Sequence, residues 1–534
     1  MPRDPYARKL LFFLLIVGVV RIVIITFTGL GPGESYYFRG VHNLQLSYFD
    51  QPPLFFWVSG LSVALFGESN FALRLPAVLF FTGTSWLLFV IARRLFSSRA
   101  GYFAAILINL SAVFTISVGN WLQPDAPLMF FWLACVYCVL RVLFPEVKSS
   151  RLDLRSNRET YIWWILTGVT MGLTTLSKYH VLFLAAGVFL FVITNKTQRH
   201  WIYHPGPYIA LLINLLFSLP ILIWNAQHEW ISFTFQGARA GSQEEFRLHF
   251  DWFFRSIMGQ MVWLTPWVWL PLTWQLIVSF RRRGEEVFGF VFWTAILPIV
   301  FFTVITLWSN LQFHFHWQAP GYMMLFIPLG HFTAQNLEGT GKWRRITSRW
   351  INASAICTIL AIAVLTLHTV TGFWRSYGPK WVAQQLGQGI DPTIEAVDYL
   401  DITERFQQEG WLEDENIFIG ATRWWLAGKV DWALKGTKEV IVFHRDARNL
   451  AYLVDPNASL GKDCIVITRG HQSNIAQYVE PHFAQVAQLE DIWITRSGVE
   501  EMKLEVYYCH DFQVPKTPLE DLPVYRQLTG RSPF

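Results

Sequence analysis

The chain has 534 residues, of which 53% are hydrophobic, 17% are aromatic and only 15% are charged. This composition excludes an ordinary soluble protein and indicates that lipid is the main solvent of the chain. The formal net charge of +5 is too small for this length to indicate a nucleic-acid-binding protein.

Apolar segments long enough to cross a membrane recur along the first 370 residues. A spanning helix needs about 20 apolar residues, and shorter runs serve when they pack among other helices, so we count about eleven segments. They cover residues 10–30, 76–92, 100–118, 126–144, 161–176, 180–194, 207–224, 259–280, 287–307, 318–336 and 350–370. We therefore predict an α-helical polytopic membrane protein.

The distribution of positive charge predicts its orientation. Lys and Arg resist translocation, and nineteen of them lie in one set of connectors against six in the other. This bias places the N-terminus in the cytoplasm. The outer, periplasmic loops are then 31–75, 119–125, 225–258 and 308–317. The first apolar run lacks a small-residue cleavage site, so we expect it to remain as an anchor.

The tail has a different composition from the rest of the chain. In residues 371–534, acidic and basic residues intermix, and strand-like runs such as 439–443 and 464–468 alternate with helical stretches such as 394–408. We predict a transmembrane domain over 1–370 and a soluble, periplasmic α/β domain over 371–534. The Arg423-Trp424-Trp425 run of this domain is interpreted as packing.

Three carboxylates lie in the predicted outer loops. Glu34 and Asp50 stand among aromatic residues of the first loop, and Asp125 stands between Pro124 and Pro127 where a helix begins. A carboxylate at the membrane surface loses solvation, so it requires a partner, a metal or a catalytic role. The alternatives are ordinary solvated loop acids and, for Asp125, a helix cap.

Cations and polar side chains occur on the same predicted side. They are Lys178, Arg239, Asn225, His228 and His316. Each cation or histidine alone is more typical of a snorkelling cation or an interfacial histidine than of a ligand-binding group. Together with the carboxylates they favour a site that binds an anionic phosphate headgroup and supplies acid–base chemistry.

A set of short motifs follows one another in a characteristic order. They are Gly33-Glu34, Tyr48-Phe49-Asp50-Gln51-Pro52-Pro53-Leu54, Arg74-Leu75-Pro76, Pro124-Asp125-Ala126-Pro127-Leu128, Leu176-Ser177-Lys178-Tyr179, Trp224-Asn225-Ala226-Gln227-His228 and His316-Trp317. In this ordered set the chain resembles the GT-C superfamily of polytopic membrane glycosyltransferases, in the bacterial branch related to protein O-mannosyltransferases and the lipid A aminoarabinose transferase. Two positions depart from the family pattern, because Gly33 replaces an Asp and Gln51 replaces a His.

The resemblance implies an enzyme that moves a sugar, with inversion, from a polyprenyl-phosphate donor to lipid A, another envelope glycan or a protein at the periplasmic face. It implies a C-terminal accessory domain over the mouth of the site. It favours Glu34 and Asp125 as the catalytic carboxylates, with Asp50 third, and it places the donor phosphate on Lys178, Arg239 and His228. It assigns acceptor or auxiliary roles to Tyr37, Asn225 and His316.

Two questions stay open from the sequence. The five cysteines and the other candidate ligands show no metal-type spacing, while metal use varies among GT-C relatives, so no cofactor is assigned and a divalent metal stays open. Because position 33 cannot act as a base, the second hypothesis is a non-catalytic binder or transporter of polyprenyl-linked sugars. A transporter would place ionisable groups along a path through the membrane, and the predicted spans hold few of them.

Overall fold

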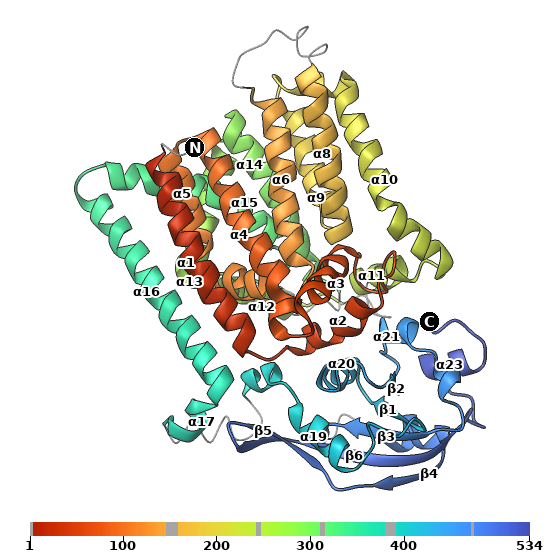
Figure 1. Ribbon diagram of the computed structural model, residues 1–534. Coiled ribbons are helices and arrows are strands. Elements are labelled where there is room, and N and C mark those ends of the chain that lie inside the picture. Colours follow the sequence, from red (N-terminus) through yellow and green to blue (C-terminus); the bar gives the residue numbers. More distant parts are fainter. Residues whose placement is uncertain (1–3, 146–157, 242–246, 310–315, 380–390, 471–474) are drawn as a thin grey trace.

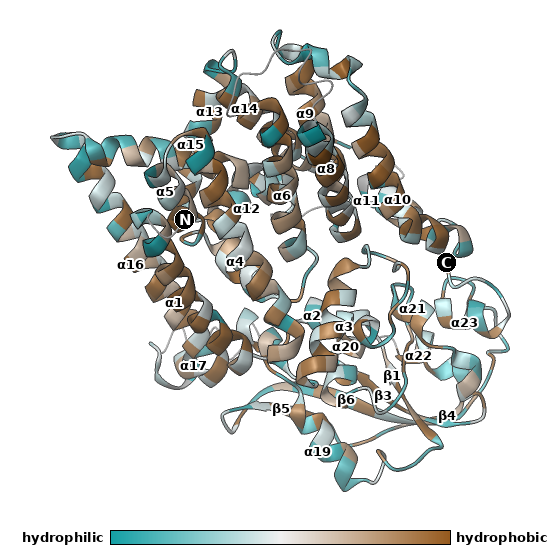
Figure 2. Cartoon of the chain, turned by 45° about the horizontal axis from the view of Figure 1, so that its top comes forward, coloured by the Kyte–Doolittle hydropathy of each residue, from teal (hydrophilic) through white to brown (hydrophobic). Residues whose placement is uncertain are grey.

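The computed structural model describes residues 4–145, 158–241, 247–309, 316–379, 391–470 and 475–534. A bundle of helices occupies most of the molecule, and a mixed β-sheet lies at one end of it (Figure 1). Hydrophobic residues dominate the bundle, whereas hydrophilic residues gather at the connectors and in the C-terminal part (Figure 2). This agrees with a helical membrane protein that carries a C-terminal domain.

The helical part begins with a long apolar helix and alternates long and short elements. Its helices are α1 (Pro5–Phe27), α2 (Pro32–His42), α3 (Leu54–Phe66), α4 (Asn70–Leu95), α5 (Ser98–Ile108), the π-helix η1 (Val113–Val118), α6 (Asp125–Leu143), α8 (Arg158–Ser177), α9 (Val181–Thr194), η2 (Arg199–Tyr203), α10 (Pro205–Gln227), α11 (Ile231–Ala240), α12 (Phe250–Leu264), α13 (Pro266–Arg281), α14 (Glu286–Val304), η3 (Ile305–Leu307), α15 (Ala319–Glu338), α16 (Lys342–Thr371) and α17 (Phe373–Tyr377).

Helices occupy all eleven predicted segments. Not every one of these helices is long and apolar enough to cross a membrane. Within the described residues, six meet that standard, namely α1, α4, α6, α10, α14 and α16, and a seventh is obtained if α12 and α13 count as one span. The predicted number of eleven spans is therefore not confirmed. The shorter apolar helices α3, α5 and α9 accompany them.

Two predicted spans are broken. The segment 259–280 is divided at Thr265, where α12 and α13 meet with a bend of 112°. Pro266 disfavours a helical conformation at the preceding residue, and Thr265 has φ +68°, which ends α12. The segment 100–118 is divided where the Asn109 side chain accepts a hydrogen bond from Arg21 of α1 (2.9 Å) and donates to Ser85 (3.0 Å).

The spans are not entirely free of charge. Arg21 lies inside α1, is 2% exposed, and packs its guanidinium over Phe81 at 4.5 Å from the ring centroid. Its bond to Asn109 links α1 to the end of α5. A buried cation in a membrane helix requires such partners, so Arg21 has a clear packing role.

The first predicted loop is largely helical. Residues 31–75 contain α2, α3 and the start of α4. One face of α3 is apolar and uncovered, because Leu61, Leu65 and Phe66 are 60%, 68% and 56% exposed. Such a face is typical of a helix that lies in the membrane interface.

The C-terminal part is built on a six-stranded mixed sheet. Its strands are β1 (Ile417–Ala421), β2 (Val440–Val442), β3 (Asp463–Thr468), β4 (Phe483–Gln488), β5 (Ile492–Arg496) and β6 (Val499–Phe512). The order is β2-β1-β3-β6-β4, with β5 also paired to β6; β1 is parallel to β2 and β3, and β6 is antiparallel to its three neighbours. In this register Cys464 lies opposite Cys509, and both thiols are free.

Short helices surround the sheet and connect its strands. They are η5 (Pro392–Ala396), α19 (Leu400–Gln408), α20 (Trp424–Ala433), α21 (Leu450–Leu453), η6 (Pro456–Ser459), α22 (Ile475–Tyr478), η8 (Glu480–His482) and α23 (Pro523–Leu528). The predicted helical stretch 394–408 is thus divided between η5 and α19. The α/β character of the tail is confirmed.

Helix α20 docks the C-terminal part onto α2. The two helices approach so closely that a Cβ on Gly428 would lie 2.5 Å from the backbone of Tyr36. Arg39 of α2 makes a bidentate ion pair with the buried Asp431 of α20. Lys429, which is fully buried, donates to the carbonyl groups of Leu30 and Val397.

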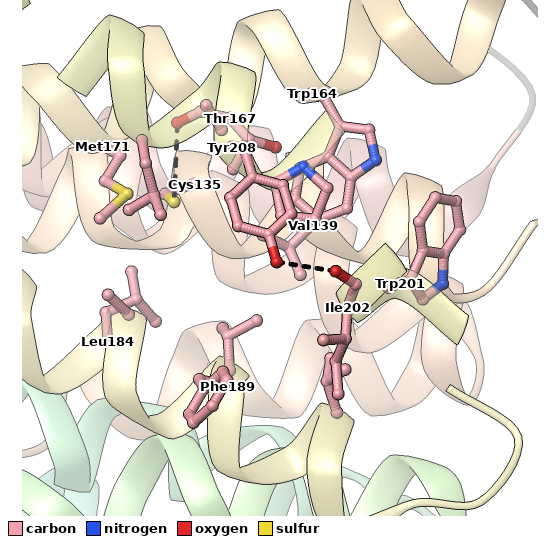
Figure 3. Close-up of a pocket in the computed structure, with 16 residues that line it drawn as sticks. Cys135, Val139, Trp164, Thr167, Met171, Leu184, Phe189, Trp201, Ile202 and Tyr208 are labelled. Carbon is pink, nitrogen blue, oxygen red and sulfur yellow. Dashed lines mark hydrogen bonds between the residues drawn. The ribbon is translucent and has the colours of Figure 1, made fainter. Parts of the chain in front are cut away.

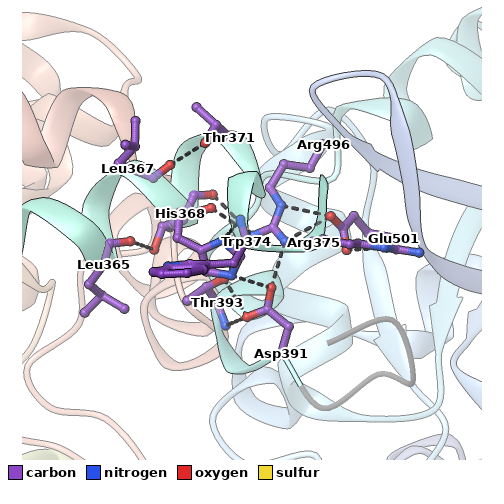
Figure 4. A network of polar contacts seen from close by, with 11 residues as sticks. Leu365, Leu367, His368, Thr371, Trp374, Arg375, Asp391, Thr393, Arg496 and Glu501 are labelled. Carbon is purple, nitrogen blue, oxygen red and sulfur yellow. Dashed lines mark hydrogen bonds and ion pairs between the residues drawn. The ribbon is translucent and has the colours of Figure 1, made fainter. Parts of the chain in front are cut away.

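A second docking contact joins the end of α16 to the sheet (Figure 4). Arg496 of β5 is 2% exposed and binds Asp391 (2.8 Å) and Glu501 (2.9 Å). His368 of α16 contacts the same Asp391 oxygen at 3.0 Å. Arg375 of α17 pairs with Glu501 at 2.5 Å, so all charges of the network have partners.

This network generates a stability prediction. Arg496→Met should lower the free energy of unfolding by about 3–5 kcal/mol, because Asp391 and Glu501 would stay buried without their main counter-charge. The measurement is thermal unfolding of the purified full chain in detergent, followed by tryptophan fluorescence. Lys503→Met is the control, since Lys503 pairs with Asp491 on the surface of the same sheet and its loss should leave the midpoint nearly unchanged. Equal midpoints for Arg496→Met and the wild type would contradict the prediction.

Candidate functional site

The Glu34 side chain connects the first turn of α2 to its surroundings. Its two carboxylate oxygens accept hydrogen bonds from Arg74 Nε (2.6 Å) and Nη2 (2.5 Å) and from the backbone N–H groups of Gly31 (2.9 Å) and Leu122 (2.8 Å). Arg74 also donates to the carbonyl groups of Thr28 and Gly29, both at 2.8 Å. The carboxylate is buried and saturated, so it joins α2, α4 and the loop before α6.

The Asp125 carboxylate is also bound through both oxygens, but by a different cation from the one that binds Glu34. It opens α6, is 2% exposed, and both of its oxygens accept hydrogen bonds from Lys178 Nζ at 3.0 Å. Lys178 follows the last residue of α8, where the tight turn to α9 directs it toward α6. Burial lowers the pKa of Lys178, and the adjacent Asp125 opposes that shift, so the pair is held as neighbouring opposite charges.

Asp50 differs from both. It is 4% exposed, and its Oδ1 atom has no hydrogen-bond partner in the described part of the chain. Burial raises the pKa of Asp50 to about 6, although Arg448, Arg239 and a hydrogen bond from Tyr36 act in the opposite direction. Asp50 is therefore a buried carboxylate with one oxygen available to accept a proton.

Two arginines approach Asp50 from different parts of the chain. Arg239 lies on α11, with its guanidinium 5.2 Å from the ring centroid of Trp317. Arg448 comes from the C-terminal part, stacks at 3.8 Å over Trp424, and bonds Asp446 through Nε at 3.2 Å. Both interact electrostatically with Asp50, and they repel each other.

Tyr37 and His316 complete this group. Tyr37 packs edge-on against Phe55 and Phe56, and burial together with the charge of Asp50 raises its pKa, so the phenol stays protonated. Burial, together with Lys178 and Arg239, lowers the pKa of His316 to about 4, although Asp125 acts in the opposite direction. The imidazole is neutral near pH 7 and serves as a hydrogen-bonding group rather than as a cation.

Asn225 and His228 lie in packing positions. Asn225 is completely buried at the end of α10, where its amide donates to Ile221 O (3.0 Å) and accepts from Ser232 N (3.1 Å). His228 stacks on Trp224 at 3.9 Å and contacts the ring of Tyr452 at 5.3 Å. The turn after α10 is thereby fixed against the C-terminal part.

A cavity of about 470 Å³ borders the first turn of α2. Its polar lining includes Glu34, Arg74, Asn120, Thr393 and Glu395, and its apolar lining comes from α1, η1, α12 and α16. Gly33 is also in this wall, and a Cβ built on it meets nothing within 4 Å. The space for the family's Asp is thus present although the carboxylate is not.

A second cavity, of about 220 Å³, lies among α6, α8, α9 and α10 (Figure 3). Its lining is mainly aliphatic and aromatic, as Leu184, Phe189 and Trp164 illustrate. Of the described residues that line it, none is Asp, Glu, Lys, Arg or His. Cys135 and Tyr208 are its titratable groups, and no charged side chain among the described lining residues could pair with a phosphate.

The structure gives roles to residues for which the sequence analysis predicted none. Arg448 and Tyr36 contact the group around Asp50, and Arg74 saturates Glu34. The Arg-Leu-Pro motif contains Arg74, but the sequence does not indicate that Arg74 pairs with Glu34. Arg448 stands in an unremarkable polar stretch about 400 positions after Asp50, and no local pattern marks it. The aromatic run at Trp424 packs as expected, against Tyr36 at 5.0 Å, and it also supports Arg448.

Chemically, the arrangement unites an available carboxylate, two guanidinium groups, a neutral histidine and protonated phenols in a buried place. Such a place can bind an anion and remove a proton from a hydroxyl group. Among the described residues, no group of three or more His, Cys, Asp or Glu side chains is placed to hold a metal ion. His314 of the predicted outer loop 308–317 lies outside the described residues.

Comparisons with known proteins agree with the motif-based resemblance. Residues 50–224 match the family model described as dolichyl-phosphate-mannose-protein mannosyltransferase. The undecaprenyl phosphate-alpha-4-amino-4-deoxy-L-arabinose arabinosyl transferase of Edwardsiella ictaluri is 30% identical over 373 residues, which are 66% of this chain and 61% of the relative. A second such transferase, from Proteus mirabilis, is 25% identical over 64% of this chain and 60% of its own length. The match thus spans about three fifths of these curated relatives.

The fold is that of solved GT-C proteins. The crystal structure of ArnT from Cupriavidus metallidurans bound to undecaprenyl phosphate superposes with a TM-score of 0.63 at 15% identity, covering 94% of this chain and 98% of that one. The archaeal oligosaccharyltransferase AglB from Archaeoglobus fulgidus superposes with a TM-score of 0.51 at 11% identity, covering 98% and 77%. These superpositions show a GT-C fold, in agreement with the motif-based resemblance, and the chain is a multi-pass membrane protein.

The Asp125–Lys178 pair generates a second stability prediction. Lys178→Met should lower the free energy of unfolding by about 3–5 kcal/mol, because Asp125 would stay buried without a counter-charge. Adding Asp125→Asn to Lys178→Met should restore most of that loss, since it removes the uncompensated charge. Thermal unfolding in detergent measures both variants.

The matched control for this pair is Arg255→Met, because Arg255 is 63% exposed and lies 3.9 Å from Asp251 on the surface of α12. Its unfolding midpoint should stay close to that of the wild type. A double variant no more stable than Lys178→Met alone would show that the two side chains are not coupled.

Proposed function

We propose that this chain is a glycosyltransferase that moves a sugar from a polyprenyl-phosphate-linked donor to a hydroxyl group of a lipid A, envelope-glycan or protein acceptor. The names of the similar transferases and the GT-C fold support this class of reaction. The observation that carries the proposal is Asp50, a buried carboxylate that interacts electrostatically with two guanidinium groups and whose Oδ1 atom has no hydrogen-bond partner among the described residues. That combination suits one step in which a phosphate leaves and a hydroxyl loses its proton.

In the proposed step, the acceptor oxygen attacks the anomeric carbon from the face opposite the phosphate. The bond from that carbon to the phosphate oxygen breaks, the new glycosidic bond forms, and the configuration inverts. Asp50 takes the proton of the acceptor hydroxyl. The polyprenyl phosphate leaves with the bonding electron pair, and nearby cations stabilise its charge.

Asp50 is preferred as the base because the other two carboxylates are occupied. Glu34 accepts four hydrogen bonds, and Asp125 is held by Lys178 through both oxygens. A proton acceptor needs an oxygen that can reach the substrate. We therefore assign positioning roles to Glu34 and Asp125, which hold α2 and the loop before α6, and propose that Tyr37 and His316 orient the acceptor.

We further propose that the reaction takes place on the periplasmic side of a bacterial inner membrane. The charge bias of the connectors supports a cytoplasmic N-terminus and an external C-terminal domain. The carboxylates, the arginines and the sheet then share one side of the membrane, where a polyprenyl-phosphate donor and a lipid acceptor meet.

The runner-up function is a non-catalytic binder of polyprenyl-linked sugars. Gly33 favours it, because the position that holds an Asp in the family has no side chain here. One measurement distinguishes the two functions. A protein of either kind binds the donor, but only a transferase transfers the sugar to an acceptor. Adding a chelator to the same assay checks whether a divalent metal takes part.

The principal test is Asp50→Asn. Transfer of radiolabelled sugar from synthetic polyprenyl-phosphate donors to an envelope-lipid extract should fall by at least about 100-fold, the contribution typical of a general base. Asp251→Asn is the matched control, because Asp251 is a 57% exposed carboxylate of α12. Wild-type turnover by Asp50→Asn would remove Asp50 as the base, and donor binding without any transfer by the wild type would favour the binder.

The pH dependence provides an independent test of the same assignment. Asp50 acts only when deprotonated, and its pKa is raised to about 6, so kcat/KM should fall about tenfold per pH unit below about pH 6. Steady-state rates between pH 4.5 and 8 measure this slope, and a flat profile would contradict the assignment.

Gly33→Asp checks the competing position for the base. The open space at Gly33 should accept the side chain without loss of stability, and the change should not rescue Asp50→Asn in a double variant. Restored transfer in the double variant would place the base at the first turn of α2 instead.

A further inference from the structure

We infer that the C-terminal domain supplies part of the donor site: the guanidinium groups of Arg448 and Arg239 together bind the phosphate of the lipid donor. This inference rests on the proposed function and names which residues hold its substrate. Under this inference, the donor site is formed by both parts of the chain and not by the membrane helices alone.

The position of Arg448 is fixed from several sides. It has φ +50° two positions before the first residue of α21, stacks at 3.8 Å over Trp424, and bonds Asp446 through Nε at 3.2 and 3.3 Å. Its side chain is 26% exposed. A long side chain held in one place has lost its conformational freedom before a ligand arrives, which favours binding.

The backbone beside Arg448 is tied to the first loop of the membrane part. The N–H of Asn449 donates to the Tyr36 hydroxyl at 2.9 Å, and the Asn449 side chain accepts from the N–H of Phe49 at 3.1 Å. Phe49 precedes Asp50 in the chain. These two bonds set the place of Arg448 relative to Asp50 whenever the C-terminal part is docked.

The guanidinium of Arg448 has donors left for a ligand. Across the described residues, its hydrogen bonds all come from Nε and all go to Asp446, so neither Nη group is engaged with the protein. Two Nη groups present a planar fork, which matches two oxygens of a phosphate. An ammonium group could not provide this geometry.

The positive charges around Asp50 favour the binding of an anion. Arg239 and Arg448 repel each other, and each is attracted to Asp50. Lys178, the other cation of the group, already binds Asp125 with both contacts at 3.0 Å. A phosphate between the two arginines would remove their repulsion, and it would leave Asp50 beside the reacting carbon.

The arrangement has a consequence for the C-terminal domain. The donor site is complete only when α20 is docked on α2, because Arg448 arrives through that contact. The buried pairs Arg39–Asp431 and Lys429–Leu30 are thus positioning contacts for donor binding as well as for the fold.

The test compares the binding of a synthetic short-chain polyprenyl monophosphate to the purified full chain and to single variants in detergent. Arg448→Gln and Arg239→Gln should each bind the lipid phosphate about 10- to 100-fold more weakly, the loss typical of a charge-assisted pair. Arg448→Lys should fall between Arg448→Gln and the wild type, since it keeps the charge but loses the fork. Arg445→Gln is the matched control, because Arg445 lies three positions away, is 57% exposed and pairs with Asp521.

The corresponding polyprenol, which lacks the phosphate, separates a binding role from a structural one. It should bind the wild type and all four variants equally, because the arginines contact only the phosphate. Loss of polyprenol binding in Arg448→Gln would show that the variant has lost its structure, and it would overturn the inference.

The remaining outcomes are distinguishable from a failure of the proposed function. Wild-type affinity of Arg448→Gln for the lipid phosphate would overturn the inference and leave the transferase proposal intact. A wild-type chain that binds no polyprenyl phosphate would instead overturn the proposed function itself.

Discussion

Helix α2 is held near both ends by ion pairs whose carboxylates are buried, and the rest of the candidate site depends on this constraint. At its start, Glu34 is bound by Arg74 of α4 and by the loop before α6. Toward its end, Arg39 pairs with Asp431 of the C-terminal part. A buried charge without a partner costs several kcal/mol, so neither pair can open without loss of stability. The helix between them is therefore a fixed support for Tyr36 and Tyr37.

The three carboxylates illustrate how burial divides similar residues into different roles. Each is less than 5% exposed, so each has lost its water. Glu34 and Asp125 recover that loss through cations and backbone donors, whereas Asp50 has one oxygen with no hydrogen bond from any described residue and has a raised pKa. A buried carboxylate oxygen that lacks a hydrogen bond within the described protein is a good candidate for reaction with a substrate, because a substrate hydroxyl group can donate to it.

The same division applies to the cations. Lys178 neutralises Asp125 and belongs to the support of the site, and Arg74 does the same for Glu34. Arg239 and Arg448 instead face one carboxylate together and repel each other. The proposed function requires a charged phosphate to bind beside a membrane, and two preorganised guanidinium groups in a place of low dielectric are suited to it. In this chain one of the two arrives from the C-terminal domain.

The sequence by itself determined the membrane class, the positions of the helical segments, the α/β tail and the order of the motifs. These follow from composition and spacing along the chain, which local patterns record. Even there, Thr265 and Asn109 interrupt predicted spans through contacts and backbone geometry that hydropathy does not register. Only the tertiary structure decided which cation pairs with which carboxylate, that one Asp50 oxygen has no hydrogen-bond partner in the described part of the chain, and that Arg448 interacts with Asp50. The physical reason is that burial and electrostatic partners depend on distance through space, and residues about 400 positions apart share no local pattern from which that distance could be predicted.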